Sequence, residues 1–161
     1  MKFFLISFLV SCLFNHKAFS LDTIAKQAIL YDYETKTIIY EKNSEELMSP
    51  SSMSKIMTMY YVFKKIKDGD LKLTDKFKVS KKAWKKGGSK MFINVNTMVS
   101  VEDLIRGIIV QSGNDACIAI AEGISGSEAL FAEELNILAK EIGMIDSSFT
   151  NSTGWPDPDH L

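Results

Sequence analysis

Ser52 and Lys55 are the two residues of this sequence whose types and spacing could carry out nucleophilic chemistry. They stand three positions apart in the stretch 50–58, where polar residues precede an apolar run. If a helix begins near Ser52, the two side chains lie one turn apart on the same face. A serine hydroxyl becomes a nucleophile when a neighbouring base takes its proton, and a neutral lysine amine can be that base. The positive end of a helix dipole favours the neutral amine and stabilises developing negative charge.

The S-x-x-K spacing also has an ordinary structural explanation, with Ser52 as a helix N-cap and Lys55 as a solvated lysine. The chain contains 17 serines and 18 lysines, so chance alone would give about two such spacings. A second polar element is Ser112-Gly113-Asn114, which lies between two apolar segments that have the pattern of helices. Such a break can direct Ser112 and Asn114 into a cleft, although it is also typical of a capping turn.

The rest of the pattern predicts the elements that position these residues. Residues 27–32 and 37–41 are expected to form two short strands joined by a turn. Four helices are expected, at residues 52–67, 100–110, 116–124 and 127–142. Apolar residues at helical spacing are expected in the core: Leu104, Ile105, Ile108, Ile109, Leu130, Phe131, Leu135, Leu138 and Ile142. The basic run 81–88 is explained most simply as a solvated loop or short helix, with binding of an anionic polymer as the alternative.

Residues 1–20 have the pattern of a cleaved secretory signal peptide. Lys2 provides the positive start, the apolar run extends from Phe3 to Phe14, and a small-residue cleavage site follows. The apolar run is too short for a comfortable membrane span. An uncleaved anchor and a lipoprotein signal at Cys12 are the alternatives. Cleavage is therefore expected to leave Leu21 as the first residue of the mature protein.

Composition excludes several classes of site. The chain is 46% apolar and 24% charged, as in an ordinary globular domain. Residues 1–20 contain two lysines and no acid, so residues 21–161 carry 17 basic and 20 acidic side chains. The resulting net charge of −3 gives no indication of nucleic-acid binding. Cys117 is the one cysteine after residue 20, and its apolar surroundings indicate a packing residue. His160 is the one histidine after residue 20, so neither a Cys–His couple nor a multi-histidine metal site is expected.

Four blocks of the sequence, in order, resemble those of the low-molecular-weight penicillin-binding proteins. These are the serine-type D-alanyl-D-alanine carboxypeptidases of bacterial cell walls, peptidase family S11. The blocks are residues 50–58, 88–92, 111–116 and 149–154, and the match covers nearly all of residues 24–160. S-x-x-K followed by S-x-N also occurs in class A β-lactamases, but S-G-N is the form found in the carboxypeptidases. The resemblance implies an α+β fold of the penicillin-binding protein and serine β-lactamase type, with an antiparallel sheet and a helical region.

The resemblance also implies a role for each site residue. Ser52 would be the nucleophile that the D-Ala-D-Ala end of a peptidoglycan pentapeptide acylates, and its N–H would be part of the oxyanion hole. Lys55 would be the general base, Ser112 the proton relay, and Asn114 would bind the substrate amide. β-Lactam antibiotics would acylate the same serine. No metal or cofactor is implied, and the expected location is the periplasm, at the outer face of the inner membrane.

One family motif has no counterpart in the sequence. The K-T-G triplet on a strand beside the serine is absent, since Ser152-Thr153-Gly154 lacks the lysine and matches a different block. Later strands, a second β-domain and a C-terminal amphipathic anchor are also missing. We therefore expect residues 21–161 to be the N-terminal part of the catalytic domain, weakly active or inactive alone, with membrane contact only through the missing anchor. The alternatives are a serine β-lactamase and a non-catalytic penicillin- or wall-binding module.

Overall fold

The computed structural model describes residues 21–161, so the predicted signal peptide lies outside the described residues. The chain divides into two compact units, one ending at Glu46 and the other comprising Leu47–Leu161. Within residues 21–161, no helix combines the length and apolar character needed to cross a membrane.

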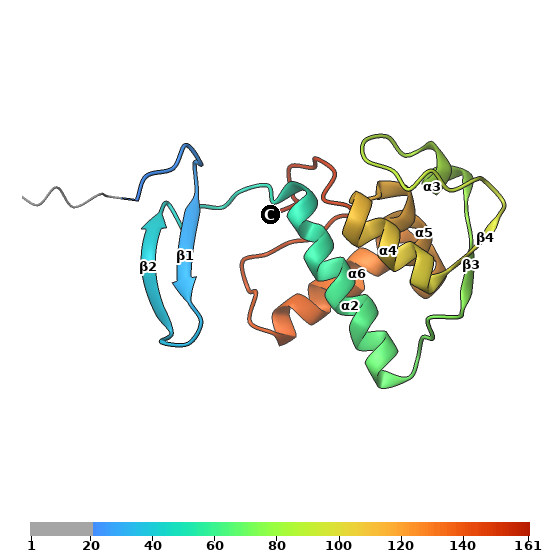
Figure 1. Cartoon of the computed structure of the whole chain (residues 1–161), viewed down its shortest axis with the longest axis horizontal. Coiled ribbons are helices and arrows are strands. Elements are labelled where there is room, and N and C mark those ends of the chain that lie inside the picture. The colour runs from blue at the N-terminus through green and yellow to red at the C-terminus, as the bar shows by residue number, and fades with distance from the viewer. Residues whose placement is uncertain (1–20) are drawn as a thin grey trace, which may run out of the picture. The chain divides into compact units, whose positions relative to one another are not determined.

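The first unit contains a β-hairpin, as the sequence predicts. Strands β1 (Ala28–Asp32) and β2 (Thr37–Lys42) pair antiparallel, with a register irregularity halfway along β1 (Figure 1). The Asp32 carboxylate accepts hydrogen bonds from the backbone N–H groups of the turn, at Glu34 and Thr35. This side-chain contact fixes the turn and therefore the strand pairing. The predicted strands are confirmed to within one residue at each end.

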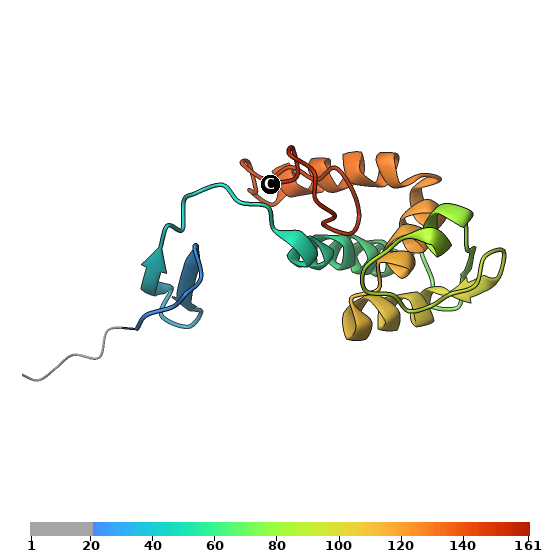
Figure 2. The same cartoon turned by 90° about the horizontal axis from the view of Figure 1, so that it is seen from above.

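The second unit is mainly helical and contains the residues of chemical interest. Its elements are the 3₁₀ turn η1 (Ser51–Met53), α2 (Ser54–Asp68), β3 (Lys76–Lys78), α3 (Lys81–Lys85), β4 (Met98–Ser100), α4 (Val101–Gln111), α5 (Asn114–Ser125) and α6 (Glu128–Glu141). Helix α5 is buried without interruption from Asn114 to Ala121 and packs against α3, α4, α6 and β3. Figure 2 shows α2 lying between α6 on one side and α4 on the other. The core of this unit therefore forms around α5.

Local sequence signals account for the helix boundaries. The hydroxyls of Ser100 and Ser127 accept hydrogen bonds from the backbone N–H groups of Asp103 and Leu130, which makes both serines N-caps. Gly69 ends α2 with φ 86°, a left-handed conformation in which glycine is free of strain. The predicted starts of these two helices, at residues 100 and 127, are confirmed to within one residue.

The sequence pattern did not predict the β3–β4 pair. Phe77 pairs with Val99 at the centre of this short antiparallel ladder. The Phe77 ring lies so close to α5 that a Cβ on Gly123 would be 2.1 Å from it. A glycine inside a helix is unfavourable by itself, so its role here is to let strand and helix approach each other.

Three predicted core residues are largely exposed instead. Ile109 is 60% exposed, Leu130 50% and Ile142 45%, whereas the other six residues expected in the core are buried. Ile109 lies on the side of α4 that faces a cavity described below, and the other two residues lie at the ends of α6. The buried stripe of each helix is thus narrower than the run of apolar residues suggests. Helices combined with small antiparallel sheets make this an α+β fold, as expected.

Candidate active site

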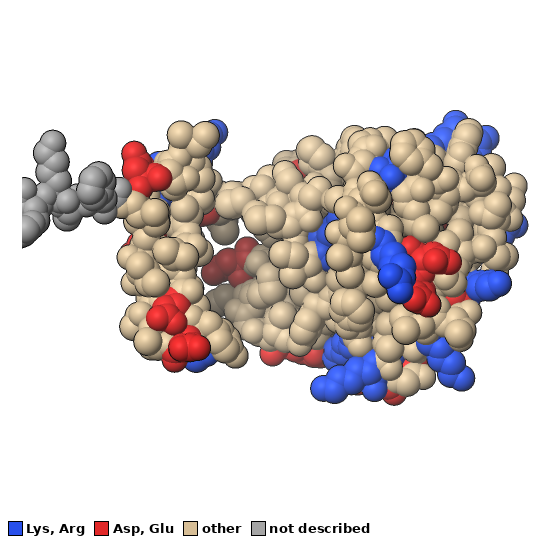
Figure 3. Space-filling model, in the orientation of Figure 1, with Lys and Arg blue, Asp and Glu red and all other residues tan. Residues whose placement is uncertain are grey.

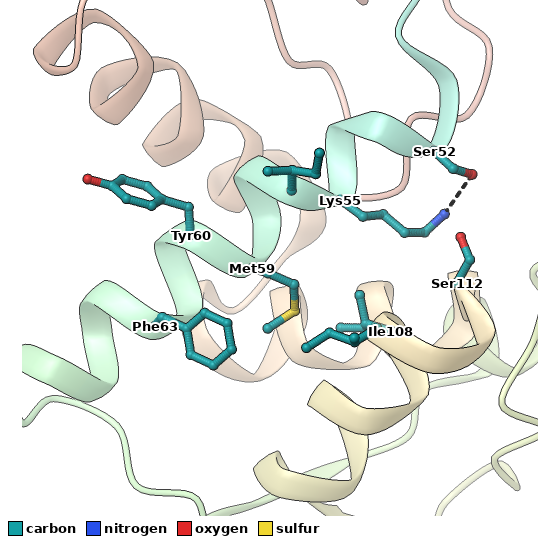
Figure 4. A pocket seen from close by; sticks show the side chains of 9 residues that line it. Ser52, Lys55, Met59, Tyr60, Phe63, Ile108 and Ser112 are labelled. Atoms are coloured by element: carbon teal, nitrogen blue, oxygen red, sulfur yellow. Dashed lines mark hydrogen bonds between the residues drawn. The ribbon is translucent and has the colours of Figure 1, made fainter. Parts of the chain in front are cut away.

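Ser52 lies on the turn immediately before α2. The predicted helix start near Ser52 is wrong by two residues, because residues 51–53 form a 3₁₀ turn and the α-helix begins at Ser54. The tighter turn still places Lys55 beside Ser52. Lys55 Nζ donates a hydrogen bond to Ser52 Oγ at 3.1 Å (Figure 4). The serine–lysine pair is thus formed in the folded chain.

Burial of Lys55 favours its neutral form. The residue is only 6% exposed, and burial lowers the pKa of its amine, against a smaller opposite effect of Cys117. A lysine with a lowered pKa can accept a proton from a neighbouring hydroxyl. Cys117 is fully buried, and burial raises the pKa of its thiol to about 12. It therefore stays a neutral packing residue, as the sequence indicates.

Ser112 comes to the same place from the junction of α4 and α5. It has φ 54°, and Gly113 N–H donates to the carbonyl of Gly107 at 3.0 Å, which closes the end of α4. A left-handed conformation is unusual for serine and costs about 1–3 kcal/mol. In Figure 4 the Ser112 hydroxyl points toward the Lys55 amine. The two motifs singled out from the sequence therefore meet in space.

Asn114 holds a loop rather than facing the pair directly. Its side-chain amide donates to the carbonyl of Gly87 at 2.9 Å, and its backbone N–H donates to the carbonyl of Ser89 at 2.8 Å. Among the residues that the structure describes, no hydrogen bond joins Asn114 to Lys55. Its predicted contact with a substrate amide stays a prediction.

Asp115 is a site-supporting residue that sequence reasoning did not identify. It is fully buried, and its carboxylate accepts the backbone N–H groups of Met91, Ile93 and Ala116 at 2.9, 3.2 and 3.0 Å. Asp115 and Asn114 thereby tie the loop of residues 87–93 to the start of α5. The available signal was an acidic residue directly before the apolar run of residues 116–121.

A cavity of about 510 Å³ begins at Ser52 and runs between α2 and α4. Its lining residues are Ser52, Lys55, Ile56, Met59, Tyr60, Phe63, Ile108, Ile109 and Ser112. The volume is in the range of small-molecule sites. Ser52, Lys55 and Ser112 lie together at one end, and aliphatic, methionine and aromatic side chains form the rest (Figure 4). Figure 3 shows few charged side chains over the first part of α2, with lysines at its C-terminal end.

The arrangement can perform acyl transfer through a serine activated by a lysine. Within residues 21–161, no three His, Cys, Asp or Glu side chains are grouped so that they could hold a metal ion.

Comparison with known proteins places this chain in a family. A family model described as D-alanyl-D-alanine carboxypeptidase, Peptidase S11, matches residues 15–161. The chain is 41% identical over 136 residues to D-alanyl-D-alanine carboxypeptidase DacF of Bacillus subtilis, covering 84% of this chain and 35% of that protein. It is 40% identical over 140 residues to DacC of Escherichia coli, covering 83% and 35%. The chain thus spans about a third of the length of these relatives.

Solved structures agree with the sequence comparison. The crystal structure of the D-alanyl-D-alanine carboxypeptidase DacD from Francisella tularensis is similar, with a TM-score of 0.83 and 39% identity, over 87% of this chain and 34% of that one. Penicillin-binding protein D2 from Listeria monocytogenes in its ampicillin-bound form has a TM-score of 0.76 and 26% identity, over 87% and 56%. The predicted penicillin-binding protein fold is confirmed. Because the family model matches the whole of the described part, the chain belongs to the D-alanyl-D-alanine carboxypeptidases of peptidase family S11.

Proposed function

We propose that this chain carries the nucleophile and base of a serine-type D-alanyl-D-alanine carboxypeptidase that trims peptidoglycan pentapeptides. The observation that supports this best is the 3.1 Å contact between Lys55 Nζ and Ser52 Oγ, made by a lysine that is almost fully buried. An amine so placed is within reach of the proton that it must remove. Of the residues expected from the sequence, Ser52, Lys55 and Ser112 line the same cavity, whereas Asn114 bonds the loop beside it.

In the acylation step, Ser52 Oγ attacks the carbonyl carbon of the penultimate D-alanine while neutral Lys55 takes the hydroxyl proton. The negative charge that develops on the carbonyl oxygen would be met by the N–H of Ser52, on the turn just before α2. Donors of this kind are among the largest contributions to acyl-transfer catalysis. The positive end of the α2 dipole acts in the same direction.

The leaving group needs a proton, and Ser112 is placed to supply it. With its hydroxyl directed toward Lys55, Ser112 can pass the proton from the lysine to the amine of the departing D-alanine (Figure 4). The peptide C–N bond then breaks, and an ester on Ser52 remains. Water hydrolyses that ester, restores the serine hydroxyl and releases the shortened peptide. Asn114 is proposed to hold the substrate amide.

The same serine is the proposed target of β-lactam antibiotics. A β-lactam ring opened by Ser52 would leave a covalent ester in place of the natural acyl-enzyme. The Listeria relative has been solved with ampicillin and with cefotaxime bound. For the protein that contains this chain, we propose export by the signal peptide at residues 1–20 and work in cell-wall biogenesis and cell shape in the periplasm. Residues 21–161 would be the N-terminal part of the catalytic domain.

The experiment is release of D-alanine from a synthetic pentapeptide by the full-length protein, beside Ser52→Ala as the inactive control. Release that depends on Ser52 supports the carboxypeptidase. Rapid hydrolysis of penicillin with no D-alanine release would favour the serine β-lactamase. Penicillin binding without turnover of either compound would favour the non-catalytic binding module.

A further inference from the structure

His160 lies far from Ser52 in the sequence, yet its ring is buried against the turn that carries this serine. None of the residue is exposed, and the Phe149 ring packs edge-on against it with centroids 5.6 Å apart. In the part of the chain that the structure describes, His160 is not one of the residues lining the cavity. Any effect on the reaction must therefore pass through its neighbours.

The hydrogen bonds of the ring define its tautomer. The backbone N–H of Thr150 donates to Nδ1 at 3.1 Å, so Nδ1 carries a lone pair and the neutral ring has its proton on Nε2. Nε2 lies 2.7 Å from Ser54 Oγ and donates to it. The Ser54 hydroxyl then donates to the carbonyl of Ser51 at 2.8 Å. The donors thus run in one direction, from His160 through Ser54 to the Ser51 carbonyl.

The charge state of the ring agrees with this direction. Burial lowers the pKa of His160, against an opposite influence of Asp157. A protonated ring would place an N–H on Nδ1, facing the N–H of Thr150. The Thr150 N–H needs an acceptor at Nδ1, and only the neutral ring provides one.

The Ser51 carbonyl belongs to the peptide unit whose N–H is that of Ser52. Ser51 has φ 49°, an unfavourable conformation for serine that neighbouring contacts must maintain. Gly154 contacts the same carbonyl so closely that a Cβ there would be 1.7 Å from the oxygen. Residues 149–160 therefore hold this peptide unit by a hydrogen-bonded relay and by direct packing.

We propose that His160 is a positioning residue that acts through Ser54 to fix the peptide unit between Ser51 and Ser52. This orientation sets both the hydroxyl that attacks and the N–H that receives the oxyanion. The inference rests on the proposed function, because it assigns His160 to the same acylation step. A misplacement of about 1 Å at such a centre can reduce the rate by about a hundredfold.

The test uses the full-length protein and a fluorescent penicillin. Labelling is measured over a range of penicillin concentrations, which gives the rate constant of acylation and, separately, the dissociation constant of the non-covalent complex. His160→Phe keeps a ring of similar size and removes the Nε2 donor. It should slow acylation about 10- to 100-fold with little change in that dissociation constant. His160→Gln, whose amide N–H can reach toward Ser54, should recover most of the rate. Adding Ser54→Ala to His160→Phe should cause little further loss, because both variants break one relay.

A matched control is Thr58→Val, which removes another buried hydrogen bond between α2 and the same segment. Thr58 is fully buried, and its hydroxyl donates to the carbonyl of Ser152 at 2.8 Å. This variant should lower the melting temperature and leave the acylation rate near that of the wild type. If it slows acylation as much as His160→Phe, His160 has only a structural role and the inference is wrong.

Other results distinguish a failure of this inference from a failure of the proposed function. Wild-type acylation rates in both His160→Phe and Ser54→Ala would overturn the inference alone. Rate losses that multiply in the double variant would also overturn the inference, because they would show that His160 and Ser54 affect acylation independently. If His160→Phe does not fold, a rate loss in Ser54→Ala is still expected and its absence refutes the proposal. A wild-type protein that is never labelled would refute the proposed function, and this inference with it.

Discussion

Gly154 is the position where a single methyl group should disturb the nucleophile most directly. A Cβ built there would lie 1.7 Å from the Ser51 carbonyl oxygen and 2.4 Å from its carbon. Real Cβ contacts essentially never fall below 3.0 Å, so the two groups would have to separate by at least about 1.3 Å. Ser51 carries the peptide bond to Ser52, and the shift therefore reaches the reacting serine.

The cost of Gly154→Ala has two parts. Gly154 has φ +74°, and an alanine in that left-handed conformation costs about 1–2 kcal/mol. Overpacking against a well-fixed backbone adds about 1–3 kcal/mol. We expect a loss of about 2–5 kcal/mol in the free energy of unfolding and a fall in acylation rate of about a hundredfold.

The control separates backbone strain from the collision. Gly126 has φ +79°, and a Cβ added to it would meet no atom within 4 Å, so Gly126→Ala should cost only the conformational part, about 1–2 kcal/mol. Urea unfolding gives both stabilities, and stopped-flow labelling with a fluorescent penicillin gives both acylation rates. Equal stability losses in the two variants, with wild-type acylation in Gly154→Ala, would refute the proposed coupling between Gly154 and Ser52.

Three further predictions concern residues at and beside the site. Asp115→Ala leaves two N–H groups of the 87–93 loop, those of Met91 and Ile93, without an acceptor. The variant should therefore lower the free energy of unfolding by about 2–5 kcal/mol. A loss below about 0.5 kcal/mol in urea unfolding would contradict this. Because burial lowers the pKa of Lys55, the acylation rate should rise with pH and level off below pH 10.5. The unfolded chain binds this proton more tightly, so stability should rise between the lowered pKa of Lys55 in the folded chain and its ordinary value of 10.5. Lys55→Arg, which cannot deprotonate, should abolish the rise in rate, and a pH-independent wild-type rate would contradict the role of Lys55. Ser112→Ala should reduce D-alanine release about 10²- to 10⁴-fold if Ser112 relays the proton, whereas release within about twofold of wild type would exclude that role.

The sequence predicted the elements that have strong local signals. The helices expected from residues 100 and 127 begin there because Ser100 and Ser127 cap them, and the hairpin turn uses the short side chain of Asp32. The S-x-x-K spacing also placed Lys55 beside Ser52 even though the local helix type differs, because a 3₁₀ turn and an α-helix both bring positions three apart together.

Features that depend on distant contacts were not predictable from local pattern. The β3–β4 ladder has only three residues on each side, and its stability depends on Phe77 packing against Gly123 of α5. His160 and Asp115 act through partners far away in the sequence, so neither spacing nor periodicity shows their roles. Exposure of Ile109 likewise depends on how α4 lies beside α2 rather than on its own sequence.

The central claim is that Ser52, activated by Lys55, forms the acyl-enzyme. The most direct measurement is mass spectrometry of the full-length protein after brief exposure to penicillin, followed by digestion and mapping of the modified peptide. The account predicts one penicilloyl group on Ser52, lost in Ser52→Ala and formed far more slowly in Lys55→Arg at neutral pH. A penicilloyl group on another residue, or undiminished labelling of Ser52→Ala, would contradict it.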